Sequence, residues 1–98
     1  TMFRQLFNPS ATPHEARQRV IEGALLLDVR TPQEFAEGHL EGALNVPVQQ
    51  LATRMDEVGP TARHVVVYCR SGGRSASAAR LLQSAGYAVT DLGPMSAW

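Results

Sequence analysis

Two short apolar runs stand out along the chain. One covers residues 24–29 and the other covers residues 64–68, which are rich in β-branched valine. Runs of this length are too short for a helix and are typical of strands buried on both faces of a parallel sheet. Weaker patterns predict short strands at residues 43–46 and 88–92, and an edge strand at residues 3–7.

Two helix starts have nearly the same sequence. Residues 12–15 read TPHE and residues 31–34 read TPQE. Each combines a capping box with a proline at the first helical position. We expect the first helix to run to about Glu22 and the second to stop near Gly38.

Two further helices are predicted from apolar spacing. Apolar residues at positions 48, 51, 52 and 55 form one stripe of a helix that Gly59-Pro60 would end. A fourth helix is expected from about Arg74 to Ala85, followed by Gly86 at its C′ position. The apolar face of that helix would carry residues 78, 81, 82 and 85.

Strands and helices alternate along the whole sequence. This order predicts an α/β sandwich with a mainly parallel sheet, and no repeat or linker divides the 98 residues. We therefore expect a single domain covering residues 1–98. Ligands of such sheets bind beyond the C-terminal ends of the strands, and Cys69 lies at one of those ends.

Composition excludes several classes of function. The formal net charge is zero, so bulk electrostatics predict no nucleic-acid or membrane partner. The single cysteine excludes an internal disulfide and a cysteine-based metal cluster, and three scattered histidines do not suggest a metal site. We expect no cofactor. No secretory signal is visible, so cytoplasm is the expected compartment.

The segment with the most chemical character is Cys69 to Ser75, which reads CRSGGRS. A strand is predicted before it and a helix after it. The adjacent Gly72 and Gly73 would allow positive φ angles, so that several N–H groups point at one centre. Together with the start of the helix they would form an anion cradle around the sulfur, which lowers the pKa of the thiol.

Charge around this loop supports the same interpretation. No acidic residue occurs from His64 through Thr90, whereas Arg70, Arg74 and Arg80 do. Cations near a helix N-terminus are unfavourable unless an anion is nearby, and a broken local rule often marks a functional site. The structural alternative is that the cysteine only fills the end of a core strand and the glycines form a tight turn.

These motifs resemble the rhodanese family of sulfurtransferases. The loop at 69–75 is similar to the active-site loop of the family. Residues 28–35 (DVRTPQEF) and 38–47 (GHLEGALNVP) resemble its other hallmark, and residues 91–98 (DLGPMSAW) resemble its closing motif. In the closing motif, Gly93-Pro94 replaces the usual Gly-Gly pair. The resemblance implies a rhodanese-like three-layer sandwich with helices on both faces of the sheet.

The resemblance also implies a thiosulfate sulfurtransferase reaction. Cys69 would take a sulfane sulfur from thiosulfate or a similar donor as a persulfide and pass it to a thiol, a protein acceptor or cyanide. The binding loop would comprise Arg70, Ser71, Gly72, Gly73, Arg74 and Ser75, in which the two arginines hold the anionic donor.

Two residues outside the loop are expected to support it. In the resembling family the residues matching Asp28 and Arg30 mainly brace the region beneath the catalytic loop. Arg30 also has the spacing to pair with Glu34.

Three alternatives remain open at the sequence level. A protein persulfide relay in a sulfur-trafficking pathway would use the same loop chemistry. A binding module without activity would typically lack the cysteine. A cysteine phosphatase or arsenate reductase of the same fold would have five residues between cysteine and arginine, whereas four separate Cys69 from Arg74.

Overall fold

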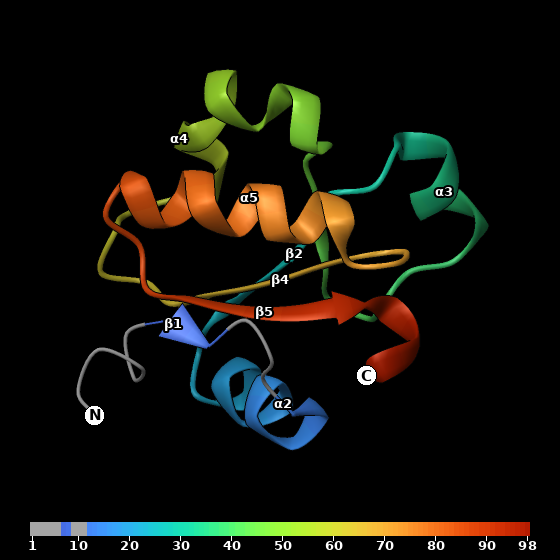
Figure 1. The fold of residues 1–98 in the computed structure, drawn as a ribbon, viewed down its shortest axis with the longest axis horizontal. Coiled ribbons are helices and arrows are strands. Elements are labelled where there is room, and N and C mark those ends of the chain that lie inside the picture. The colour runs from blue at the N-terminus through green and yellow to red at the C-terminus, as the bar shows by residue number, and fades with distance from the viewer. Residues whose placement is uncertain (1–6, 9–11) are drawn as a thin grey trace.

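The centre of the fold is a five-stranded sheet with the order β1-β5-β4-β2-β3, in which every pair of neighbours is parallel (Figure 1). The computed structural model describes residues 7–8 and 12–98. The strands are β1 (Phe7–Asn8), β2 (Leu25–Asp28), β3 (Leu44–Asn45), β4 (Val65–Cys69) and β5 (Val89–Pro94). The predicted edge strand at 3–7 lies outside the described residues except for Phe7, which pairs with Val89.

Helices cover both faces of this sheet, which confirms the predicted three-layer sandwich (Figure 1). On one face lies α2 (Pro13–Ile21), and on the other lie α5 (Gly73–Ser84), the 3₁₀ helix η1 (Val48–Thr53) and α4 (Met55–Val58). The short α3 (Pro32–Glu37) and the 3₁₀ turn η2 (Met95–Ala97) stand near the C-terminal ends of the strands.

The continuous apolar runs are explained by two separate cores. Leu25, Leu27, Val65 and Val67 belong to the core on the α5 side. Alternate positions on the same strands, such as Leu26 and Val66, belong to the core on the α2 side. Because successive side chains point to opposite faces of a strand, a strand covered on both sides needs apolar residues at every position.

The predicted helix starts are confirmed by their caps. The Thr12 side chain accepts a hydrogen bond from the Glu15 N–H at 3.2 Å. At α3 the capping box is complete, because Thr31 accepts from the Glu34 N–H and Glu34 accepts from the Thr31 N–H. At the end of α5, Gly86 has φ +103°, as expected for a C′ glycine.

The prediction of one continuous helix from Val48 is wrong. The segment forms η1 and then the short α4, with a break at Arg54. A 3₁₀ helix has three residues per turn, so Val48 and Leu51 align toward the core. Ala52, which an α-helical stripe would have buried, is exposed.

The predicted apolar face of α5 is also shifted. Ala78 and Leu82 are buried as expected, but Ala79 is buried in place of Ala85, which caps the helix and is exposed.

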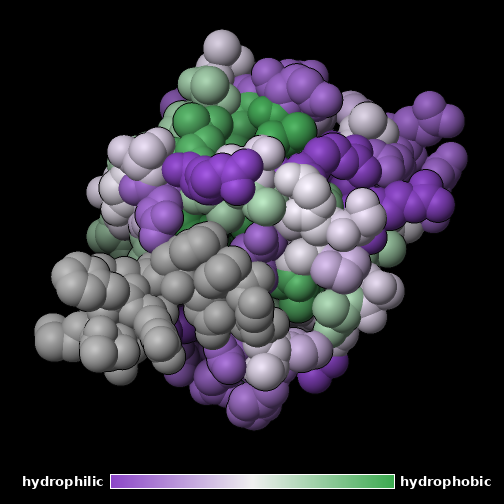
Figure 2. Space-filling model, in the orientation of Figure 1, coloured by the Kyte–Doolittle hydropathy of each residue, from purple (hydrophilic) through white to green (hydrophobic). Residues whose placement is uncertain are grey.

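Polarity differs between regions of the surface. Hydrophilic residues gather on the side of the molecule where α3 lies in Figure 1, and they appear in purple at the right of Figure 2. Within residues 7–8 and 12–98, none of the helices combines the length and the apolar character that crossing a membrane would demand.

Candidate active site

The segments that follow β2, β4 and β5 meet at the C-terminal edge of the sheet (Figure 1). Parallel strands bring their C-terminal ends to the same edge, which is where ligands bind in such folds. Cys69 is the last residue of β4 and lies opposite Pro94 of β5. Its exposed fraction is 0%, so its side chain belongs to the core on the α5 side.

The sulfur of Cys69 accepts hydrogen bonds from the loop that follows it. The Gly72 N–H donates to Sγ at 3.0 Å. The Ser75 side chain and the Ser75 and Ser71 N–H groups also favour a charged sulfur and lower the pKa of the thiol. Burial by itself raises the pKa of the Cys69 thiol, but these groups together outweigh it and the net shift is downward. The cradle therefore favours a thiolate inside the fold.

The two glycines of the loop have different conformations. Gly72 is the N-cap of α5 and has φ +108°, which other residues adopt only with strain. Gly73 is the first residue of the helix, and its φ is not positive. The expectation that both glycines supply positive φ is therefore wrong, because the turn into α5 needs only one such residue.

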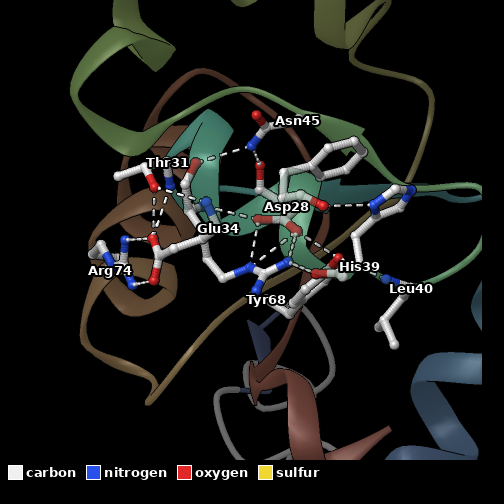
Figure 3. Close-up of polar contacts among 11 residues, drawn as sticks. Asp28, Thr31, Glu34, His39, Leu40, Asn45, Tyr68 and Arg74 are labelled. Atoms are coloured by element: carbon white, nitrogen blue, oxygen red, sulfur yellow. Dashed lines mark hydrogen bonds and ion pairs between the residues drawn. The ribbon is translucent and has the colours of Figure 1, made fainter.

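Arg74 forms an ion pair that the sequence did not predict. Its two terminal nitrogens donate to the two carboxylate oxygens of Glu34 at 2.6 and 3.0 Å, which joins α5 to α3 (Figure 3). Arg74 and the Thr31 cap hold the pKa of Glu34 down at about 2. The expected pair between Arg30 and Glu34 is wrong, since Glu34 is engaged by Arg74.

Arg30 instead pairs with Asp28 below the loop. The two side chains are buried, and the guanidinium donates to both carboxylate oxygens with a shortest distance of 2.7 Å. A further hydrogen bond from the Arg30 guanidinium reaches the Gly38 carbonyl at 2.7 Å. The Tyr68 hydroxyl donates to Asp28 at 2.6 Å and accepts from the Leu40 N–H at 3.1 Å (Figure 3). This network fixes the segment after β2 against β4.

A cleft of about 440 Å³ opens at this edge of the sheet. Its walls come from the segment after β2, from α3, from the Cys69 loop and from η2. The lining residues are Arg30, Glu34, Glu37, Gly38, Arg70, Met95 and Ser96. Its size lies within the ~300–1,000 Å³ range of small-molecule sites.

The structure brings most of the predicted site residues together. Ser75 is fully buried and its hydroxyl donates to the Gly72 carbonyl at 3.1 Å, while Arg70 and Ser71 are exposed.

Sequence reasoning missed Glu34, Glu37 and Tyr68 at this site. Glu34 was missed because its place in the capping box of α3 already explained why a glutamate stands there. A signal for Tyr68 was available, because a single hydroxyl in a run of valines needs a partner when buried.

Residues 12–98 match the family described as the rhodanese-like domain. The chain belongs to the rhodanese-like sulfurtransferase family. A sulfurtransferase of Allochromatium vinosum is 47% identical over 66 residues, which cover 67% of this chain and 61% of that protein. Thiosulfate sulfurtransferase 16 of Arabidopsis thaliana, named as chloroplastic, is 38% identical over 85% of this chain and 80% of its own.

Solved structures of rhodanese proteins share the fold. A human single-domain sulfurtransferase has a TM-score of 0.71 at 30% identity, covering 92% of this chain and 91% of its own. A rhodanese-like domain from Anabaena reaches a TM-score of 0.78 at 29% identity, covering 93% of this chain and 73% of its own. This rhodanese-like chain spans 61% of the Allochromatium relative and 49% of a Bacillus subtilis relative.

Proposed function

We propose that this rhodanese-like protein transfers a sulfane sulfur through a persulfide on Cys69. In the first step the Cys69 thiolate attacks the outer sulfur of thiosulfate or a similar donor. The Sγ–S bond forms, the S–S bond of the donor breaks, and its electron pair leaves with sulfite. The negative charge stays on the new outer sulfur, where the loop N–H groups can stabilise it.

In the second step a nucleophilic acceptor attacks the outer sulfur. Cys69 leaves as the thiolate, and the acceptor departs as a persulfide, or as thiocyanate when cyanide is used. Because the two substrates react in turn, ping-pong kinetics are expected. A protein acceptor in a sulfur-trafficking pathway would use the same step, so the relay differs from the enzyme only in its partners.

The observation that carries this proposal is the convergence of donors on Sγ. Three backbone N–H groups and one hydroxyl stabilise the anionic sulfur, and the pKa of the thiol is lowered although the side chain is buried. A cysteine that only fills a strand end would have no need of this arrangement. The relatives named thiosulfate sulfurtransferase support the same chemistry.

The geometry of Arg74 argues against phosphate chemistry. A phosphatase loop presents its arginine to the phosphate, whereas here both terminal nitrogens of Arg74 are occupied by Glu34. The same ion pair leaves Arg70 as the arginine of the loop that faces the cleft. We therefore propose Arg70 as the residue that holds the anionic donor, and Arg74 as the residue that fixes the start of α5.

One observation favours the alternative of a binding module. Cys69 has an exposed fraction of 0%, and catalytic cysteines are usually partly exposed. If the loop does not open to a donor, the domain binds partners without transferring sulfur. Measurement of sulfite release from thiosulfate separates sulfur transfer from binding without transfer.

Sulfite release from thiosulfate in the presence of cyanide tests the proposal. Wild type and Cys69→Ser are compared, with hydrolysis of para-nitrophenyl phosphate measured in parallel. We expect sulfite from wild type alone and no phosphate release from either protein. Phosphate release that depends on Cys69 would overturn the proposal, and silence in both assays would favour the binding module.

Localisation in the cytoplasm stays a prediction. Two relatives carry names that place them in chloroplasts and mitochondria.

A further inference from the structure

A second pocket lies at the opposite end of the sheet from the Cys69 loop. Cys69 is the last residue of β4, whereas this pocket reaches His64, the residue directly before that strand. The end of α2, the turn into β2 and the turn into β4 line it. Its volume of about 260 Å³ is below the ~300–1,000 Å³ of sites for organic ligands, so it suits a small ion.

Three side chains of this pocket are basic and one is acidic. Arg19 lies in the last turn of α2, and Arg63 and His64 directly precede β4. The acidic residue is Glu22, which caps the C-terminus of α2. Even with a neutral imidazole at His64, the two arginines exceed the glutamate by one positive charge.

The positive charge of the pocket is not neutralised within the described part of the chain. Neither Arg19 nor Arg63 forms an ion pair with a described residue. Nε of Arg63 donates to the Gly23 carbonyl at 3.1 Å, which fixes the guanidinium between the two turns. The terminal nitrogens of Arg63 form no hydrogen bond with the described residues. Glu22 accepts a hydrogen bond from the Gln18 amide at 3.2 Å.

His64 is held in the pocket by a neutral partner. Its Nε2 lies 2.7 Å from the hydroxyl of Thr90, which is buried on β5. Its Nδ1 has no hydrogen-bond partner among the described residues and is not fully buried, so it is open to a ligand. Burial and the nearby Arg19 lower the pKa of His64, and Glu22 opposes them with a smaller effect.

We propose that this pocket binds a small, doubly charged oxyanion between Arg19, Arg63 and His64. The terminal nitrogens of Arg63 match two oxygens of such an ion, as guanidinium groups do with phosphate and carboxylate. Its two negative charges balance the excess charge of the arginines and one proton that His64 takes up from solvent. The site is separate from the cleft beside Cys69 and does not depend on sulfur transfer.

The test is the pKa of each histidine, measured by NMR in sodium sulfate and in sodium chloride at equal ionic strength. Sulfate stays doubly charged throughout the titration, so only the protein changes its protonation. Wild type, Arg63→Gln, Arg19→Gln and Arg80→Gln are compared. Arg80 is the matched control, because it is an exposed arginine of α5 that does not line the pocket. The amide spectrum of each variant shows whether it is folded.

Sulfate should raise the pKa of His64 in wild type by about 1 and in a saturable manner, because a nearby anion favours the imidazolium. His14 and His39 are exposed, lie outside the pocket and should not respond. The dissociation constant for sulfate should rise about fivefold in Arg63→Gln and in Arg19→Gln, since each loses a charged contact to the ion. Arg80→Gln should keep the wild-type value.

Equal pKa values of His64 in sulfate and in chloride would overturn the inference. The same change at His14 and His39 would also overturn it, because it would be a general effect of the salt. So would a weakening in Arg80→Gln as large as that in Arg63→Gln, which would come from the overall charge. Sulfite release plays no part in this measurement, so its result is independent of the proposed function.

Discussion

Cys69 combines burial with a lowered pKa, two properties that usually oppose each other. Loss of solvent disfavours a thiolate, and here the donors of the loop compensate for that loss. Among these residues, Ser75 lowers the pKa of Cys69 through both its side chain and its N–H, and it is itself fully buried.

Replacement of Ser75 by alanine tests the contribution of its hydroxyl. The pKa of Cys69 should rise, because the variant lacks the Ser75 hydroxyl, which can turn from the Gly72 carbonyl toward a thiolate, while the backbone donors remain. The sign follows from the wild-type shift: a lowered pKa gives thiolate at lower pH, so the variant titrates at higher pH. Ultraviolet absorbance of the thiolate measures the shift, with Ser77→Ala as a control on the exposed side of α5. An unchanged titration curve in Ser75→Ala would contradict the account.

The sequence predicted the hydrogen-bonding loop around Cys69 better than it predicted the contacts between distant residues. A cysteine between a strand and a glycine-containing helix start is enough to predict a cradle, because backbone N–H groups at that position have few other partners. Contacts from residues far apart in the chain were missed. Arg74 meets Glu34 across 40 positions, and nothing in the local pattern of either residue indicates the other.

At the scale of elements, the loop and α5 depend on the different roles of Gly72 and Gly73. Gly72 has φ +108°, whereas Gly73 begins the helix and has open space where a side chain would project. Gly72 is therefore required by its positive φ angle, whereas Gly73 is not. The sequence pattern alone does not distinguish these two roles.

Alanine at each glycine should have opposite consequences. Gly72→Ala should strain the turn by about 1–3 kcal/mol and displace the N–H that contacts Sγ, so that both stability and thiolate fraction fall. Gly73→Ala should be neutral or stabilising by about 0.4–1 kcal/mol, because its conformation suits alanine. Urea unfolding and thiolate absorbance measure both effects. Equal losses in the two variants would show that the loop does not have this conformation.

The ion pair between α3 and α5 gives a second prediction at this scale. Glu34→Gln should lower the free energy of unfolding at neutral pH by about 1–2 kcal/mol, because it removes a paired carboxylate that also caps α3. The pKa of Glu34 is lowered from 4.5 to about 2, so the advantage of wild type is complete above pH 4.5. It should fade as the pH drops toward 2. Chemical denaturation at several pH values tests this, with Glu41→Gln as the exposed control; a difference independent of pH would exclude the ion pair as its source.

For the whole molecule, the fold class followed from the sequence because each level of pattern agreed. Apolar runs such as residues 64–68 predicted strands covered on both sides, and the two capping boxes predicted the helices between them. The prediction for the segment from Val48 was wrong because its apolar spacing fits both an α-helix and a 3₁₀ helix. Packing against the core decides between the two, and here it favours the 3₁₀ helix. That residues 1–98 form one domain stays a prediction.

The arrangement of the whole molecule also gives the cleft its charges. The walls of the cleft come from segments that follow three different strands. The sequence alone therefore did not show that Glu37 and Arg70 line the same cleft. Parallel topology brings these segments to one edge, where a buried network beneath them leaves the Cys69 loop facing the cleft.

The most direct test of the central claim is the intact mass of the protein after incubation with thiosulfate. The account predicts that wild type gains the mass of one sulfur atom, that cyanide removes it, and that Cys69→Ser gains nothing. A wild-type protein whose mass does not change under these conditions, or a Cys69→Ser variant that gains sulfur equally, would contradict a persulfide at Cys69.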